Sequence, residues 1–112
     1  MFPIDLFASL EARSRDLLSA KGYRRTRTDL SGPFDSRYAE YESARSRISI
    51  IWDGKENWLV LSVITLPLQP NSLARELYFE RFSGRAGKRS PYEAAVEQLL
   101  EQLEAFSENK RI

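Results

Sequence analysis

The stretch RSRISIIWDGKENWLVLSVITL, residues 45–66, decides the fold that we expect. Two runs rich in β-branched and aromatic residues flank Asp53-Gly54, a pattern typical of a β-hairpin. A loop of even length, beginning at Asp53 and two or four residues long, places the apolar side chains of both runs on one face. That face would carry Ile48, Ile50, Trp52, Leu59, Leu61 and Val63. The hairpin therefore predicts an antiparallel sheet with Trp52 in the core and Trp58 on the opposite face.

The neighbouring sequence extends this hairpin to a four-stranded antiparallel β-meander. A tight turn at Ala44-Arg45 would join the hairpin to an earlier strand and add Ala39 and Tyr41 to the apolar face. An arginine-rich run before it is typical of an edge strand, because charged side chains discourage pairing with another sheet. The expected strands are residues 23–30, 37–43, 46–52 and 57–66.

A helix is expected on each side of the sheet sequence. Apolar residues recur at helical spacing over 5–21, where Gly22 supplies the stop. Ser90-Pro91-Tyr92-Glu93 matches a capping box, so the final helix should begin at Pro91. Each helix has one apolar stripe, which predicts an α+β fold with the N-terminal and C-terminal helices packed on one face of the sheet.

The segment 71–82, NSLARELYFERF, fits two structures. Asn71 can cap a short helix that carries Leu73, Leu77 and Tyr78, whereas LYFERF alone can be an edge strand. We adopt the helix as the prediction.

Composition limits the classes of function. With 112 residues, the chain is expected to form a single domain, 1–112, and a net charge of +1 gives it no overall attraction to nucleic acid or membranes. The chain has no cysteine and no histidine, which removes disulfides, thiolate nucleophiles, the usual zinc sites and imidazole catalysis. We therefore expect no enzymatic activity, no cofactor and no metal site.

The sequence also predicts a cytoplasmic protein that does not engage a membrane. Residues 1–15 lack a basic start, and Asp5 interrupts their apolar run, unlike a signal peptide. The longest apolar run, 58–66, is far shorter than the roughly 20 residues that a membrane span needs.

The sheet face opposite the apolar one is the candidate binding surface. It combines a large aromatic ring and aliphatic residues with a ladder of Glu and Arg, which resembles an interface with an apolar centre and a charged rim. We predict that it binds another protein or a second copy of this chain as a homodimer, unless the segment 71–89 folds over it. The predicted partner-binding residues are Tyr38, Glu40, Glu42, Arg45, Arg47 and Trp58.

Basic clusters suggest an alternative, a nucleic-acid or anion-binding module. Arg24, Arg25 and Arg27 lie beside Tyr23, and basic residues interleaved with aromatic ones suit phosphates and bases. Lys88, Arg89 and Ser90 precede the final helix, whose free amides could hold an anion. A solvated flexible loop is the favoured explanation of this second cluster.

A third hypothesis is an enzyme that uses Tyr38, Glu40 or Glu42. Glu40 and Glu42 share one strand face and could act as paired carboxylates. Arg45 and Arg47 on the next strand favour ordinary cross-strand ion pairs instead.

The order of elements in the first 65 residues carries a family resemblance. A helix is followed by the GYRR strand, the YAEYES strand and the RISIIWDGKENWLVLSV hairpin. This order resembles small, mostly uncharacterised bacterial α+β proteins, some of them immunity proteins that neutralise toxins. The resemblance implies a role in protein binding.

Overall fold

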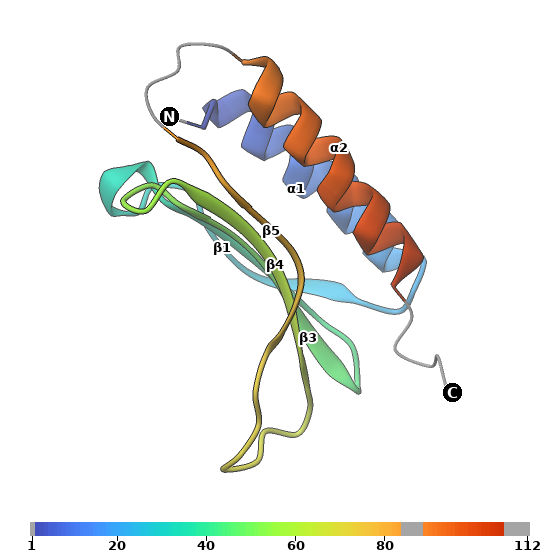
Figure 1. Ribbon diagram of the computed structural model, residues 1–112. Coiled ribbons are helices and arrows are strands. Elements are labelled where there is room, and N and C mark those ends of the chain that lie inside the picture. The colour runs from blue at the N-terminus through green and yellow to red at the C-terminus, as the bar shows by residue number, and fades with distance from the viewer. Residues whose placement is uncertain (1, 84–88, 107–112) are drawn as a thin grey trace.

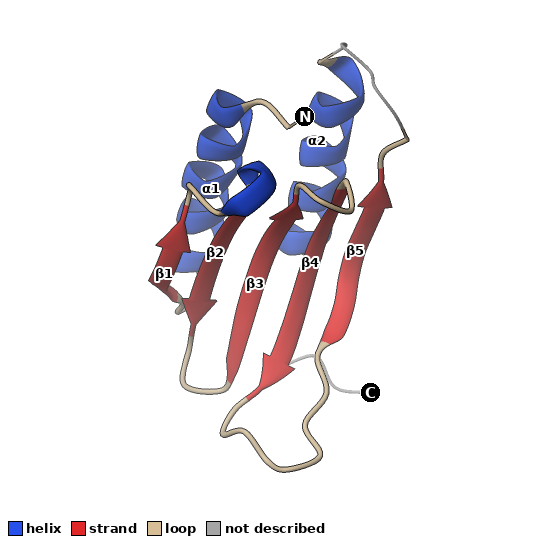
Figure 2. Cartoon of the chain, turned by 90° about the vertical axis from the view of Figure 1, so that its left-hand side faces the viewer, coloured by secondary structure: helices blue, strands red, loops and turns tan. Residues whose placement is uncertain are grey.

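The computed structural model describes residues 2–83 and 89–106. Its elements are α1 (Ile4–Ser19), β1 (Arg24–Asp29), the short 3-10 helix η1 (Pro33–Asp35), β2 (Arg37–Glu42), β3 (Ser46–Asp53), β4 (Trp58–Thr65), β5 (Arg75–Arg81) and α2 (Ser90–Ala105). The strands form one antiparallel sheet in the order β1-β2-β3-β4-β5, and both helices cover the same face of it (Figures 1 and 2). The α+β class and the placement of the helices are confirmed, but the sheet has five strands instead of the predicted four.

The β3–β4 hairpin has the predicted parity. Trp52 pairs with Leu59, and Ile50 pairs with Leu61, so these four side chains share the helix-covered face. Asp53 stays in the ladder opposite Trp58, so the four-residue loop is 54–57, one residue later than a loop that begins at Asp53. The reason is local: the Asp53 carboxylate accepts the backbone N–H groups of Lys55 and Glu56, both at 3.0 Å.

The turn between β2 and β3 also matches the expectation. Ser43 N donates to Ser46 O at 2.9 Å, so Ala44 and Arg45 form a two-residue loop. This register puts Ala39 and Tyr41 on the helix-covered face, where both side chains are fully buried.

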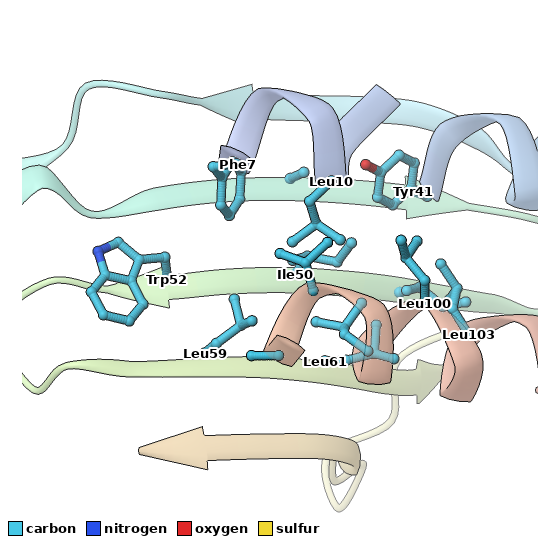
Figure 3. Close-up of a cluster of buried hydrophobic side chains, with 14 of the residues drawn as sticks. Phe7, Leu10, Tyr41, Ile50, Trp52, Leu59, Leu61, Leu100 and Leu103 are labelled. Atoms are coloured by element: carbon cyan, nitrogen blue, oxygen red, sulfur yellow. The ribbon is translucent and has the colours of Figure 1, made fainter. Parts of the chain in front are cut away.

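The core fills the space between the sheet and the two helices (Figure 3). At one end, the Trp52 ring packs against the rings of Phe2, Phe82 and Tyr92. Further along, aliphatic residues of the central strands meet aliphatic residues of both helices. The labelled members of this cluster are Phe7, Leu10, Tyr41, Ile50, Trp52, Leu59, Leu61, Leu100 and Leu103.

The segment 71–82 contains a strand, so the predicted helix there is wrong. A strand beside β4 pairs with the backbone N–H and C=O groups along the open edge of β4, which a helix could not do. The alternation of side chains is consistent with this, because Tyr78 and Phe82 pack against the core while Phe79 between them is exposed. The alternative interpretation of LYFERF, as an edge strand, is the correct one.

No helix in the described part of the chain is long and apolar enough to cross a membrane. Helix α1 ends at Ser19, two residues before the predicted end, and the chain then turns through Gly22, which has a φ of +91°. Tyr23 N donates back to Leu18 O at 2.9 Å, which fixes the entry into β1. Strand β1 is exposed along its length, as an edge strand should be.

Candidate functional site

The sheet face turned away from the helices, here called the outer face, is the candidate functional site. Because side chains alternate along a strand, every second residue of β1–β5 lies on this face. Figure 2 views the sheet from this side, with both helices behind it. The described part of the segment 71–89 does not fold over the outer face, because β5 extends the sheet at its edge.

The polar half of the outer face is organised around Glu40, which is 9% exposed. Its carboxylate accepts a hydrogen bond from the Tyr38 hydroxyl at 2.5 Å and one from the Thr26 hydroxyl at 3.0 Å. The Arg47 guanidinium lies 3.6 Å from Glu40 and 2.7 Å from the Glu42 carboxylate. Local backbone geometry permits the Thr26 contact, because Thr26 is the extra residue in a bulge of β1.

These contacts change the protonation behaviour of the group. Burial raises the pKa of Glu40, but the hydrogen bonds from Tyr38 and Thr26 and the charges of Arg47 and Arg27 outweigh it, so the pKa lies below its ordinary value. Burial, together with the bond to Glu40, raises the pKa of Tyr38. Glu40 is therefore held ionised while Tyr38 stays a neutral donor, an arrangement suited to a fixed ion network.

Glu40→Gln should make the free energy of unfolding less dependent on pH in the acid range. A carboxyl with a depressed folded pKa stabilises the fold above its unfolded pKa, here the ordinary value of 4.5, and this stabilisation is lost as the pH falls through the folded pKa. We expect the variant to be about 1–2 kcal/mol less stable at pH 7 and to have a shallower decline between pH 5 and 3. Urea denaturation across this range measures both, and parallel declines in the two proteins would contradict the network.

The second half of the outer face is aromatic. The Trp58 ring on β4 lies 5.4 Å from the Phe79 ring on β5, centre to centre. The Arg81 guanidinium lies 5.0 Å from the centre of the Trp58 ring and also pairs with Glu56 at 3.3 Å. Phe79 remains 42% exposed, which leaves an apolar surface at this edge of the face.

The structure brings some of the predicted binding residues together and separates others. Tyr38, Glu40, Glu42 and Arg47 form the network just described, whereas Trp58 pairs with Asp53, six residues along β3 from Arg47. At the rise of a strand this is a separation of about 20 Å. Arg45 lies in the two-residue turn, where its backbone N–H donates to the Ser43 hydroxyl at 3.1 Å.

Sequence reasoning misses part of this face. The helix predicted over 71–82 leaves out Phe79 and Arg81, although the alternation in LYFERF is a signal that could have found them. Thr26 and Arg27 join the network because of the β1 bulge, for which the sequence has no signal.

The arginines of the predicted nucleic-acid cluster lie on different faces of β1. Arg25 pairs with Glu11 at 3.2 Å on the helix-covered side. Arg24 pairs in register with Glu42 on the outer face, and the Arg27 guanidinium lies 5.4 Å from the centre of the Tyr38 ring.

The predicted anion-binding residues are described only in part, because Lys88 lies outside the described residues. Arg89 binds the Asp5 carboxylate at 2.7 Å and the Glu93 carboxylate at 2.9 Å. The predicted capping box is wrong: Arg89 is the N-cap of α2, and the amides of Tyr92 and Glu93 donate to its carbonyl oxygen. The Glu93 carboxylate bonds the guanidinium instead of the Ser90 amide. Anion binding here stays a prediction.

Catalytic residues would be expected in an enclosed site. A pocket of about 350 Å³ lies between β5 and α2, and none of Tyr38, Glu40 and Glu42 lines it. Within residues 2–83 and 89–106, no group of three or more acidic side chains is arranged to hold a metal ion.

No protein-family model matches this chain, and no curated protein or solved structure is significantly similar to it.

Proposed function

We propose that this protein is a binding protein whose outer face engages another protein. The observation that carries the proposal is the half-exposed ring of Phe79 packed beside Trp58 and Arg81, on the same face as an ordered network of Tyr, Glu and Arg side chains. Trp, Tyr and Arg dominate the binding energy of protein interfaces, and apolar rings beside fixed polar groups are the usual composition of such sites.

The charges on the outer face favour a protein over a nucleic acid. Arg47 already has the carboxylates of Glu40 and Glu42 as counter-ions, and Arg81 has Glu56. A phosphate backbone would compete with these carboxylates for the same guanidinium groups. A partner surface with both charge signs and apolar groups is complementary to the face as it stands.

We further propose an immunity-type role, in which the partner is a toxin, and a cytoplasmic location. The order of elements in the first 65 residues, which resembles that of immunity proteins, supports this role. The absence of cysteine fits a reducing compartment.

Loss of the Trp58 ring should weaken partner binding with little change in folding. Trp58→Ala removes an interface ring and keeps the ion network, so we expect binding to weaken by tenfold or more, about 1.4 kcal/mol. Adding Arg47→Glu should abolish binding by placing a third carboxylate beside Glu40 and Glu42. Capture of a partner from an extract of the source cells, followed by titration of the purified partner, measures both effects.

A charge change on the helix side of the molecule is the matched control. Glu104→Arg, on the exposed side of α2, should leave partner binding unchanged. Unchanged binding in the Trp58→Ala and Arg47→Glu protein would eliminate the proposal. Dimerisation that the double substitution abolishes would assign the outer face to a second copy. Binding to generic DNA or RNA that falls steeply with salt would favour the nucleic-acid alternative.

A further inference from the structure

Within the described part of the chain, one edge of strand β5 is free, and the backbone groups that point toward this edge can be assigned. β5 is the last strand of the sheet, and its only strand neighbour among the described residues is β4. Phe82 N donates to Asn57 O at 2.8 Å, so Phe82 directs its backbone toward the preceding hairpin. In an antiparallel ladder this direction alternates from residue to residue. Phe79 and Arg81 therefore point their N–H and C=O groups away from β4, toward the free edge.

Both edges of the sheet carry charged residues and a bulge, but on β5 they lie toward the ends of the strand and leave its centre less protected than β1. β1 carries three arginines and a bulge at Thr26, both of which discourage the addition of another strand. The centre of β5 is Leu77-Tyr78-Phe79, without a charge. The register of the β4–β5 ladder shifts between Leu61 and Ser62, so the pairs that β4 makes with Tyr78 to Arg81 are regular.

A pocket opens beside the same edge, on the helix-covered side. It measures about 350 Å³ and is lined from β5 by Tyr78, Glu80 and Arg81, from the residue after β5 by Phe82, and from α2 by Tyr92 and Gln98. Figure 2 shows β5 at the edge of the sheet with α2 behind the neighbouring strands. The rings of Phe82 and Tyr92 stack at 4.6 Å and form an apolar wall. A strand added to β5 would direct every second side chain into this pocket.

The pocket lining holds one acidic and one basic residue, Glu80 and Arg81. The Arg81 guanidinium is turned toward Glu56 and the Trp58 ring on the outer face, which leaves the Glu80 carboxylate as the charge that faces the pocket. The Glu80 carboxylate accepts a weak hydrogen bond from the Tyr78 hydroxyl at 3.4 Å, and no Lys or Arg of the described residues pairs with it. Burial and the charge of Glu80 raise the pKa of Tyr78 to about 12. Glu101 lies one helical turn beyond Gln98 on α2 and is exposed. A cationic side chain is therefore complementary to this site.

We propose that the β5 edge and the adjoining pocket form a second binding site, which takes an extended basic segment of a partner protein as a sixth strand. The segment bonds the free backbone groups of Phe79 and Arg81. It directs a Lys or Arg toward Glu80 and an apolar side chain, two residues away, onto the Phe82–Tyr92 wall. This site uses the backbone groups of Phe79 and Arg81 and the helix-covered side of β5, whereas the outer face uses the side chains of these two residues, so the site does not depend on the function proposed above.

A defined peptide tests the site. The probe has ten residues, with threonine at every second position and lysine and valine in turn between them, and the control peptide has glutamate in place of lysine. We expect the lysine peptide to bind saturably and to slow hydrogen exchange at the Phe79 and Arg81 amides. The glutamate peptide should bind at least about tenfold more weakly. No change at these two amides, or equal affinity for both peptides, would overturn the proposal.

Two substitutions at one position isolate the main-chain contact. Phe79→Pro and Phe79→Ala both lose the ring, but only the proline removes the outward N–H, which the ladder with β4 does not use. The proline variant should bind the lysine peptide about tenfold more weakly than the alanine variant, the equivalent of one hydrogen bond. Thermal unfolding checks that both variants fold.

A charge variant keeps the proposal testable if the proline variant does not fold. Glu80→Gln should weaken the lysine peptide about fivefold to tenfold and strengthen the glutamate peptide, because the like charge that repels it is gone. If the Glu80→Gln variant and the unsubstituted protein bound the lysine peptide equally well, the proposed pairing of the peptide's lysine with Glu80 would be overturned. Sedimentation that shows a dimer dissociated by Phe79→Pro would assign the edge to a second copy instead and overturn the peptide site.

Discussion

Trp52→Ala is expected to lower the free energy of unfolding by about 3–5 kcal/mol, because it leaves a cavity where the largest core side chain stood. Trp52 is 1% exposed, and its ring lies 5.1 Å from the Phe2 ring and 6.1 Å from the Tyr92 ring. These partners belong to the segment before α1 and to α2, so the indole joins elements from both ends of the chain. A domain of this kind has a total stability of roughly 5–15 kcal/mol, so the loss is a large fraction of the whole.

The second tryptophan provides the matched comparison. Trp58 contacts Phe79 and Arg81 on the outer face and has no helix above it. Trp58→Ala should cost only about 1 kcal/mol, the value of one aromatic pair and one exposed cation–π contact. Guanidinium denaturation of both variants, with the slope unchanged, measures the difference. Equal losses would contradict the assignment of Trp52 and Trp58 to opposite faces.

The part of the fold that the sequence can predict is the part in which local pattern and burial agree. Ile48, Ile50 and Trp52 recur at every second position and define one face, and a slip of one residue would expose all of them. The Asp53-Gly54 turn signal then identifies the run that pairs with it. Together these two features place both tryptophans on the correct faces of the sheet.

The segment that forms β5 is mispredicted because its local preferences conflict. Asn71 and the spacing of Leu73 and Leu77 suit a helix, while Tyr78 and Phe79 suit a strand. The open edge of β4, which only the tertiary fold supplies, decides between them. The same error removes Phe79 from the candidate site, so the aromatic half of the outer face is predicted only through Trp58.

Helix capping shows a similar limit. Ser90 and Glu93 have the spacing of a capping box, but Arg89 contacts Asp5 of α1 and Glu93 at the same time. A bond between two elements 84 positions apart cannot be inferred from a four-residue motif. The Arg89 guanidinium binds the Glu93 carboxylate and so competes with the Ser90 amide for it. Arg89 becomes the N-cap of α2.

The loop at the end of the central hairpin packs against the short 3-10 helix η1. Gly54 lies directly against the backbone of η1: its N–H donates to the Ser36 hydroxyl at 3.0 Å. A Cβ at position 54 would overlap the carbonyl oxygen of Phe34 and lie 2.8 Å from its carbonyl carbon. Phe34 and Asp35 already hold left-handed φ values of 57° and 61°, so this backbone has little freedom to move aside.

Gly54→Ala should therefore lower the free energy of unfolding by about 2–3 kcal/mol, the cost of overpacking against backbone rather than against a flexible side chain. Gly22→Ala is the comparison, because Gly22 has a φ of +91° but open space around it. Its cost should be about 1 kcal/mol, from backbone strain alone. Denaturation measures both losses, and amide shifts at Phe34 and Ser36 should change only in the Gly54 variant. If those shifts stayed fixed while stability was unchanged, η1 would not rest on the hairpin turn as it does here. Glycine would then be required at position 54 only by the turn. In the present structure the close approach of the Phe34 carbonyl is a second requirement for glycine, and it comes from the tertiary fold.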